Sequence, residues 1–221
     1  MLQVSNLRCV RGDRLLFSDV NFSLLPGTLL QVSGPNGSGK TSLLRIICGL
    51  LEPASGEVRW QGENIRSLNE EYSRAISYLG HRNGIKEELT PLENLRISSG
   101  LAGAPVTENA CDALEQVDLK NQKDLPARFL SEGQKRRSAL ARLITGNASL
   151  WILDEVLASL DAAAMVLVRS LIEGHLRKGG IAVVATHQEL NLTAGSFQRL
   201  ELGAPGTAVA NGAVPVGLPS S

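Results

Sequence analysis

A glycine-rich loop, Gly34-Pro35-Asn36-Gly37-Ser38-Gly39-Lys40-Thr41, is the first segment of this sequence whose residue types and spacing could do chemistry. Glycines allow the backbone N–H groups of such a loop to turn inward around phosphate oxygens. Lys40 adds a full positive charge that can reach the β- and γ-phosphates, and Thr41 offers a hydroxyl group to Mg²⁺. The loop therefore predicts a binding site for ATP or GTP.

Two neighbouring carboxylates follow an apolar run, Leu150–Leu153, and could complete this site. Asp154 can hold Mg²⁺ through water. Glu155 can act as a general base that polarises the attacking water. The alternative is an ordinary strand end with solvated acids, but the glycine-rich loop upstream favours the functional interpretation.

His187 follows a second apolar run, Ile181–Ala185. Because the carboxyl ends of parallel strands meet at one edge of a sheet, we expect His187 to lie near the γ-phosphate. There it can donate a hydrogen bond as charge develops. A lone histidine is more often structural, and His175, on a predicted helix, takes that interpretation.

A second glycine-containing loop, Leu130-Ser131-Glu132-Gly133-Gln134, opens a predicted helix far from the first loop in the sequence. Ser131 is a candidate N-cap, which is the simpler interpretation. A helix start of this kind is also a second anion-binding site, for which a single chain has no obvious use. Its place between the first loop and the acidic pair suggests a site completed by a second copy of the chain.

The candidate site therefore has three sets of residues. The catalytic set is Lys40, Glu155 and His187. The nucleotide-binding set is Gly34, Pro35, Asn36, Gly37, Ser38, Gly39, Lys40, Thr41, Ser42, Ser131, Gly133 and Gln134. Thr41 and Asp154 form the metal set, so the expected ligands are ATP and Mg²⁺.

A parallel sheet is needed to bring these loops to one edge. The apolar run Leu29–Val32 predicts a strand that leads into the glycine-rich loop, and Lys40–Leu50 follows with helical spacing. A helix over about Ala162–Lys178 joins the two later apolar runs in a βαβ unit. The N-terminal stretch is β-rich, with clear alternation over Asp19–Leu25.

Polar, helix-like segments at Pro91–Ser98, Thr107–Val117 and Glu132–Thr145 predict a helical subdomain over about 83–147. The expected fold class is thus α/β: a P-loop NTPase core with an N-terminal antiparallel β subdomain and an inserted helical subdomain. Residues 1–203 form one predicted domain. Residues 204–221 are uncharged and rich in Gly, Ala, Pro and Val, and we expect this tail not to fold.

Composition excludes several classes of function. The 221 residues contain 22 Lys+Arg and 22 Asp+Glu, so no bulk attraction to nucleic acid is expected. No apolar run approaches the roughly 20 residues needed to span a bilayer, and the start lacks the features of a signal peptide. The three cysteines have no metal-site spacing, which favours free thiols in a reducing cytoplasm.

Over residues 2–203 the motifs resemble those of the ATP-binding-cassette (ABC) ATPases. The second loop is similar to the family's LSGGQ signature, Ser159-Leu160-Asp161 to its D-loop and His187 to its switch histidine. The resemblance implies two cassettes that pair head to tail. Each ATP would be held by Lys40 of one copy and by Ser131 and Gly133 of the other, and closure would drive membrane subunits.

Shorter phrases, among them Trp60-Gln61-Gly62, Leu79-Gly80-His81 and Thr186-His187-Gln188, resemble the haem-exporter ATPases of cytochrome c maturation. That likeness implies a peripheral subunit on the cytoplasmic face of the inner membrane, working with integral haem-exporter subunits. Haem contact would belong to those partners. The alternatives are a cassette ATPase of another small-molecule transporter or, less favoured by a single cassette without a long heptad run, a non-transport cassette protein.

The sequence departs from the family pattern at four places. His81 stands where a glutamine usually ends the strand before the helical subdomain, and we expect it to tune coupling more than ATP affinity. Glu132 replaces a signature glycine and should point away from the γ-phosphate. Val156 replaces a proline after the acidic pair. The adenine-stacking aromatic is missing, and Arg11 is the candidate to stack on the base.

Overall fold

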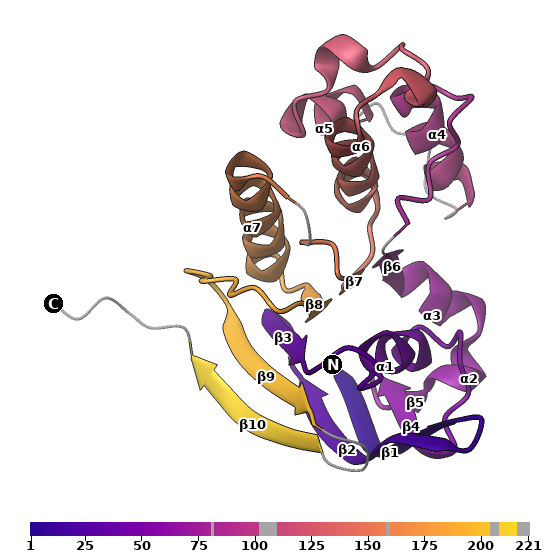
Figure 1. The fold of residues 1–221 in the computed structure, drawn as a ribbon, viewed down its shortest axis with the longest axis vertical. Coiled ribbons are helices and arrows are strands. Elements are labelled where there is room, and N and C mark those ends of the chain that lie inside the picture. The colour runs from indigo at the N-terminus through magenta and orange to yellow at the C-terminus, as the bar shows by residue number, and fades with distance from the viewer. Residues whose placement is uncertain (81, 102–109, 158–159, 204–207, 216–221) are drawn as a thin grey trace, which may run out of the picture.

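A six-stranded sheet positions the glycine-rich loop in the computed structural model, which describes residues 1–80, 82–101, 110–157, 160–203 and 208–215 (Figure 1). Its strands lie in the order β10-β9-β3-β8-β7-β6. Neighbouring strands from β9 to β6 are parallel, whereas β10 is antiparallel to β9. The strands are β3 (Thr28–Ser33), β6 (Ile76–Leu79), β7 (Leu150–Asp154), β8 (Ile181–Ala185), β9 (Ser196–Leu202) and β10 (Ala208–Pro215).

Every residue of β7 and β8 is buried, which explains their continuous apolar sequences. A second sheet, in the order β2-β1-β4-β5, is antiparallel throughout. Helix α1 (Lys40–Ile47) shares one apolar core with both sheets. The strands of the second sheet are β1 (Leu2–Arg11), β2 (Arg14–Leu24), β4 (Ser55–Trp60) and β5 (Glu63–Asn64).

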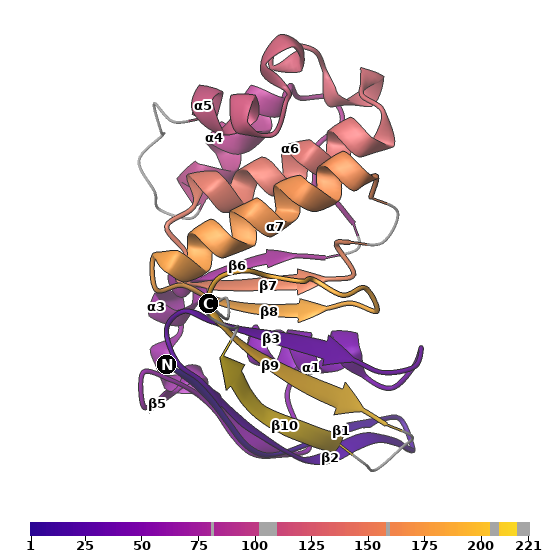
Figure 2. The ribbon, with the colours of Figure 1, turned by 90° about the vertical axis from the view of Figure 1, so that its left-hand side faces the viewer.

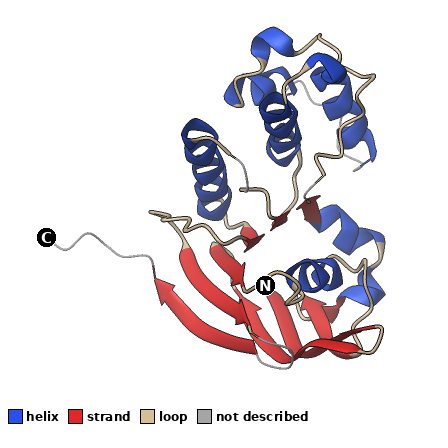
Figure 3. Cartoon of the chain, viewed as in Figure 1, coloured by secondary structure: helices blue, strands red, loops and turns tan. Residues whose placement is uncertain are grey.

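Helices α4 to α7 lie above the strands in Figure 3. Between β6 and β7 in the chain lie α4 (Pro91–Leu101), α5 (Ala110–Gln116), the 3₁₀ turns η1 (Lys120–Gln122) and η2 (Ala127–Phe129), and α6 (Glu132–Thr145). Helix α7 (Ala162–Arg177) lies beside α6 over the parallel strands (Figure 2). Short helices α2 (Ile65–Leu68) and α3 (Glu70–Ala75) precede β6.

A second apolar core joins these helices to the sheet and includes Leu114, Leu140, Leu153 and Ile172. The α/β fold class with an antiparallel N-terminal sheet and a helical insertion is therefore confirmed. No helix among the described residues is long and apolar enough to cross a membrane. The three cysteines are free, as expected.

The expectation of an unfolded tail is wrong over Ala208–Pro215. This segment forms β10, which pairs with β9 from Ala208↔Leu202 to Pro215↔Ser196. The composition of the tail shows that its side chains form a core poorly. An edge strand, however, offers a row of backbone donors and acceptors with which any extended segment can pair, whatever its side chains. Residues 204–207 and 216–221 lie outside the described residues.

The ring of His175 packs α7 against β7. It stacks on Trp151 with centroids 4.0 Å apart and planes 8° apart, and its Nε2 donates to Ile181 O at 3.1 Å. Burial lowers the pKa of His175 below its ordinary value, so the neutral ring is the folded form. The structural interpretation of this histidine agrees with these contacts.

Replacing His175 with Phe should reduce the pH dependence of stability below pH 6.5. With a lowered folded pKa, wild-type protein binds fewer protons when folded than when unfolded. Its free energy of unfolding is therefore full above about pH 6.5 and falls as the pH drops toward the folded pKa. Phe keeps the stacked ring but takes up no proton.

Urea unfolding of wild type and His175→Phe between pH 8 and pH 5.5 checks this. The variant should take up fewer protons on unfolding, by up to one, between pH 6.5 and 5.5. If the free energy of unfolding depended on pH in the same way for both proteins across that range, His175 would not be a neutral ring held by the fold.

Candidate nucleotide-binding site

The glycine-rich loop connects β3 to α1, and its fit against β2 explains one of its glycines. Gly39, the residue before α1, has φ 103°, in the left-handed region. A side chain there would lie 3.0 Å from the Phe17 ring and 3.1 Å from Leu16. Glycine is needed at this position both for its backbone conformation and for the close packing of β2 beneath the loop.

Lys40 brings the three predicted catalytic residues together. Its side chain is 5% exposed, and its Nζ donates to Gly34 O at 2.7 Å and Pro35 O at 3.3 Å. The same atom lies 3.1 Å from His187 Nε2 and 3.9 Å from Glu155 Oε1. Residues from α1, from the turn after β7 and from the turn after β8 thus meet at one cation.

The contact with Lys40 also restricts the protonation of His187. An ammonium group has only donors, so His187 Nε2 accepts in this arrangement and the ring proton belongs on Nδ1. To donate to a phosphate through Nε2, the ring needs the other tautomer or a second proton. His187 is exposed, whereas Thr186 before it is buried.

The two predicted metal-binding residues are also adjacent. Thr41 Oγ1 donates to Asp154 Oδ1 at 3.2 Å, and Asp154 is 4% exposed at the end of β7. The second carboxylate oxygen, Oδ2, accepts from Tyr78 OH at 3.2 Å. Oxygen donors of this kind suit Mg²⁺. Thr41 and Asp154, expected from the sequence to share a metal ion, thus lie side by side, and Tyr78 behind them was not expected.

Tyr78 lies on β6, which is next to β7 in the sheet. Burial, followed by the charge of Asp154, raises the pKa of Tyr78 to about 12, so its hydroxyl stays a donor at neutral pH. No short motif contains this residue. Only the strand order brings it to a carboxylate 76 positions later in the chain.

Glu155 occupies a turn with a left-handed backbone, φ 53°. Its N–H donates to Ala185 O at 3.0 Å, which holds the turn against β8. This conformation costs a non-glycine residue about 1 kcal/mol or more. The buried residues that follow, Val156 and Leu157, fix the turn from the other side and leave the Glu155 side chain 38% exposed.

Gln31 is a further residue that the sequence reasoning missed. It is buried on β3, and its Nε2 donates to Gln188 O at 3.2 Å and, more weakly, to Thr186 O at 3.5 Å. Gln188 N in turn donates to Thr186 Oγ1 at 3.0 Å. These bonds hold the turn that carries His187. A polar residue within an otherwise apolar strand was the available signal.

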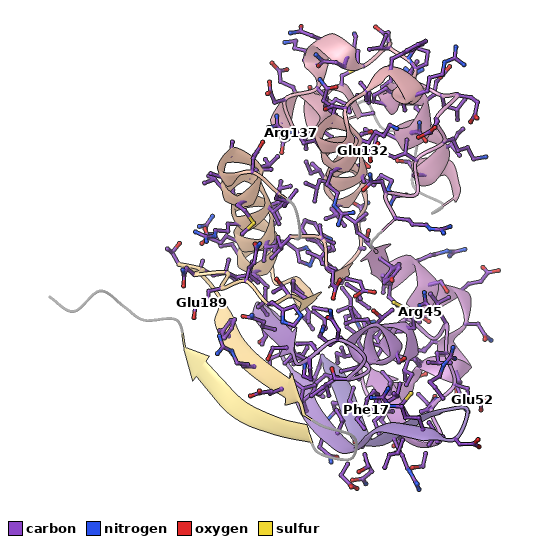
Figure 4. All side chains as sticks on the ribbon, viewed as in Figure 1. Phe17, Arg45, Glu52, Glu132, Arg137 and Glu189 are labelled. Carbon is purple, nitrogen blue, oxygen red and sulfur yellow. The ribbon has the colours of Figure 1, made fainter. Side chains whose placement is uncertain are left out.

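The second loop does not join this cluster within one chain. Ser131 caps α6 in a reciprocal capping box with Gln134, whose N–H donates to Ser131 Oγ at 3.2 Å and whose Oε1 accepts from Ser131 N at 2.9 Å. Glu132 is largely exposed and pairs with Lys135 at 3.1 Å. Figure 4 labels Glu132 in the helical part and Phe17, which packs beneath the glycine-rich loop, among the strands.

A cavity of about 390 Å³ adjoins the glycine-rich loop and reaches the β1–β2 hairpin. Its lining includes Arg11, the residue expected to stack on the base, and also Arg14 and Leu16, which the sequence analysis did not single out. None of the described lining residues is aromatic. His81 and Ser159 lie outside the described residues. The lining is Arg11, Arg14, Leu16, Asn36, Gly37, Gly39, Lys40, Thr41, Ser42 and Glu155.

Comparison with known proteins identifies the family. The sequence model of the ABC transporter family matches residues 17–158, which is more than half of the chain. The chain belongs to the ABC transporter family.

Relatives of nearly equal length carry a more specific description. The chain is 54% identical to the "Cytochrome c biogenesis ATP-binding export protein CcmA" of Nitrosospira multiformis, over 91% of this chain and 98% of that protein. It is 51% identical to the protein of the same description from Dechloromonas aromatica, over 92% and 100%. Among solved structures, a putative ABC transporter ATP-binding protein from Pyrococcus furiosus matches with a TM-score of 0.77 and 26% identity, over 91% and 96%.

Membership of the ABC transporter family identifies the ligand of the glycine-rich loop beside Lys40 as ATP. The chain is an ATP-hydrolysing subunit that binds ATP and works with membrane subunits. Within the family pattern, this chain keeps the serine and the second glycine of the signature loop but directs the extra carboxylate of Glu132 to Lys135.

Replacing Tyr78 with Phe should raise the Mg²⁺ concentration needed for half-maximal ATP hydrolysis by about tenfold, as is typical when a partner of a metal-binding group is lost. The variant removes the hydrogen bond to Asp154 Oδ2 and little volume. Tyr72→Phe is the matched control, because Tyr72 OH donates to Ile47 O at 2.7 Å, away from the acidic pair. Titration of turnover with Mg²⁺ checks both variants.

The control should lose about 1 kcal/mol of stability and keep the wild-type Mg²⁺ dependence. If turnover depended on Mg²⁺ concentration equally in Tyr78→Phe and wild type, Tyr78 would not orient Asp154 for the metal.

Proposed function

We propose that this chain is the ATPase subunit of an exporter that serves cytochrome c biogenesis, with haem as the cargo. The observation that carries the proposal is the identity of 54% and 51% to relatives of that description across nearly their whole length. The residues around Lys40 account for ATP chemistry in any ABC transporter, so they do not separate haem export from the transport of another small molecule.

ATP would be held by the loop Gly34–Thr41, by Ser42 and by the Lys40 ammonium, with Mg²⁺ on Thr41 and Asp154. The oxygen donors at 3.2 Å from each other support this metal, since Mg²⁺ prefers hydroxyl and carboxylate oxygens. The described residues contain no cluster of three His, Cys, Asp or Glu, so phosphate and water oxygens would complete the coordination. When bound, Mg²⁺ neutralises charge on the β- and γ-phosphates.

Glu155 would act as the general base of hydrolysis. Its carboxylate would accept a proton from the water whose oxygen bonds to the γ-phosphorus, as the bond from that phosphorus to the β–γ bridging oxygen breaks and ADP leaves, while Lys40 would stabilise charge on the phosphoryl oxygens. The 3.9 Å distance between the two side chains supports their action on one substrate group. The turn at Glu155, tied to Ala185 O, supports a fixed direction of approach. His187 would donate a hydrogen bond to the same phosphate.

A second copy of the chain would supply Ser131, Gly133 and Gln134 to each ATP. This helix start is exposed, and Figure 4 shows Glu132 in the helical part and Phe17, which packs against the glycine-rich loop, among the strands; both observations support an intermolecular role. The N–H groups of the first turn of α6 favour an anion. ATP can shift the balance between open and closed pairs only by its differential affinity for the two.

The working location would be the cytoplasmic face of the inner membrane, as a peripheral subunit on integral haem-exporter partners. The balanced charge, 22 basic against 22 acidic residues, supports the absence of a nucleic-acid partner. Both described histidines already have partners, His175 at Ile181 O and His187 at Lys40. These contacts support the proposal that haem is bound by the integral subunits.

Glu155→Gln should retain ATP binding and lose turnover by about 100-fold or more, the usual contribution of a general base. The amide keeps the shape of the side chain but accepts no proton. Phosphate release measures turnover, and size exclusion with ATP should reveal an accumulated closed dimer. Turnover close to wild type would remove Glu155 from the base role.

Affinity purification of the chain from membranes tests the cargo assignment. Integral subunits of cytochrome c biogenesis should co-purify, and deletion of the chain should abolish holocytochrome c while apocytochrome is still made. Recovery of a different permease, with cytochrome c unaffected by the deletion, would refute haem export and leave the ATPase assignment intact.

A further inference from the structure

Arg136 is a buried cation on α6 without a carboxylate partner among the described residues. It is 9% exposed. Its Nη1 donates to Gly80 O at 3.0 Å and Asn83 Oδ1 at 2.9 Å, and its Nε donates to Val156 O at 3.3 Å. One guanidinium thus connects three segments: the signature helix, the segment after β6 and the turn after Glu155.

An unpaired buried charge is unfavourable unless its hydrogen bonds are made, because the group has lost its water. Burial lowers the pKa of Arg136, and the neighbouring cation Arg142 adds to this effect. Arg142 Nη1 also donates to a backbone oxygen of the same segment, Gly84 O, at 3.2 Å. Two cations, neither of them paired with a carboxylate in the described part of the chain, therefore hold this segment through backbone oxygens, at a cost in desolvation that apolar side chains would not carry.

The position of Val156 makes the contact relevant to catalysis. Val156 is fully buried and follows Glu155 directly, and the backbone of Glu155 is tied to Ala185 O on its other side. Arg136 lies in α6 five residues after the cap Ser131. A displacement of the signature end of α6 would therefore act on the Val156 carbonyl through the directional hydrogen bond from Arg136 as well as through the apolar core that both share.

We propose that Arg136 is a positioning residue that links the signature end of α6 to the Glu155 turn and to Gly80 and Asn83 after β6. The inference rests on the proposed role of Glu155 as the base. In the assembled exporter, engagement of the signature loop by the second copy would move α6 and thereby align Glu155. The alternative is that Arg136 only fills space between the sheet and the helices.

Arg136→Met, which keeps the length of the side chain and removes its donors, tests the link in membranes containing the assembled complex. The kcat for ATP should fall by about tenfold or more, since small displacements of a catalytic group carry costs of this size. The ATP Kd of the full chain should stay within about twofold of wild type, because Arg136 does not line the nucleotide cavity.

Arg137→Met is the matched control. This neighbour on α6, labelled in Figure 4, donates to Asp118 Oδ2 at 2.9 Å, and its ion pair in the described structure is with the same residue, not with Gly80, Asn83 or Val156. It should keep wild-type kcat. Equal losses in both variants, or a loss of ATP affinity and thermal stability that parallels the loss of kcat in Arg136→Met, would overturn the proposal in favour of a packing role.

Asn83→Ala provides a second variant that leaves the cation in place. It should lower kcat by a smaller factor, and the double variant with Arg136→Met should lose no more than Arg136→Met alone. Additive losses would mean that the two residues act separately, against the proposal. If Glu155→Gln keeps its turnover, the proposed base is wrong; if Glu155→Gln loses turnover while Arg136→Met keeps it, only the link is wrong.

Discussion

The buried ammonium group of Lys40 is the interaction on which the arrangement of the site depends. With 5% of its side chain exposed, it must satisfy its donors within the protein. It does so with the carbonyls of Gly34 and Pro35 and with the ring of His187. Because these partners lie on two different loops, one cation fixes how the loops approach each other. The Glu155 carboxylate, 3.9 Å away, adds the opposite charge from a third loop.

That convergence depends in turn on the register of the parallel sheet. Asp154 pairs with Ala185 across β7 and β8, and Thr186 N donates to Val32 O on β3. The turns after the three strands therefore begin at the same level of the sheet. A slip of one residue would point Asp154 to the opposite face and break its bonds with Thr41 and Tyr78. Both faces of β7 are buried, since its side chains are divided between the two apolar cores.

The helical part is attached to this edge by polar as well as apolar contacts. Arg136 and Arg142 reach from α6 to backbone oxygens of the segment after β6, while Leu140 and Leu153 share the second apolar core. Apolar packing tolerates small shifts in direction, but hydrogen bonds to carbonyls do so poorly. The capping box of Ser131 and Gln134 orders the exposed end of the same helix. The capping box thus orders the start of α6, and the hydrogen bonds of Arg136 and Arg142 set the orientation of its middle relative to the sheet.

The sequence by itself determined the glycine-rich loop, the acidic pair, His187 and the parallel strands that carry them. Each of these depends on a few contiguous residues whose local conformation and chemistry are carried in the motif. It also predicted the helical insertion, from the polar, helix-like segments Pro91–Ser98 and Glu132–Thr145, the second of which begins at the cap Ser131. The prediction for Ala208–Pro215 failed because this strand is held by backbone pairing at a sheet edge, which amino-acid composition does not reveal.

Only the tertiary structure decided the roles of Tyr78, Gln31 and Arg136. Tyr78 meets Asp154 across 76 positions, Gln31 meets Gln188 across 157, and Arg136 meets Gly80 across 56. Such contacts follow from strand order and from how α6 lies on the sheet, and no local spacing encodes either. The residue types and spacing within a short motif determine which chemistry that segment can do. The residues that orient its side chains come from elements distant in the chain, and only the packing of those elements brings them together.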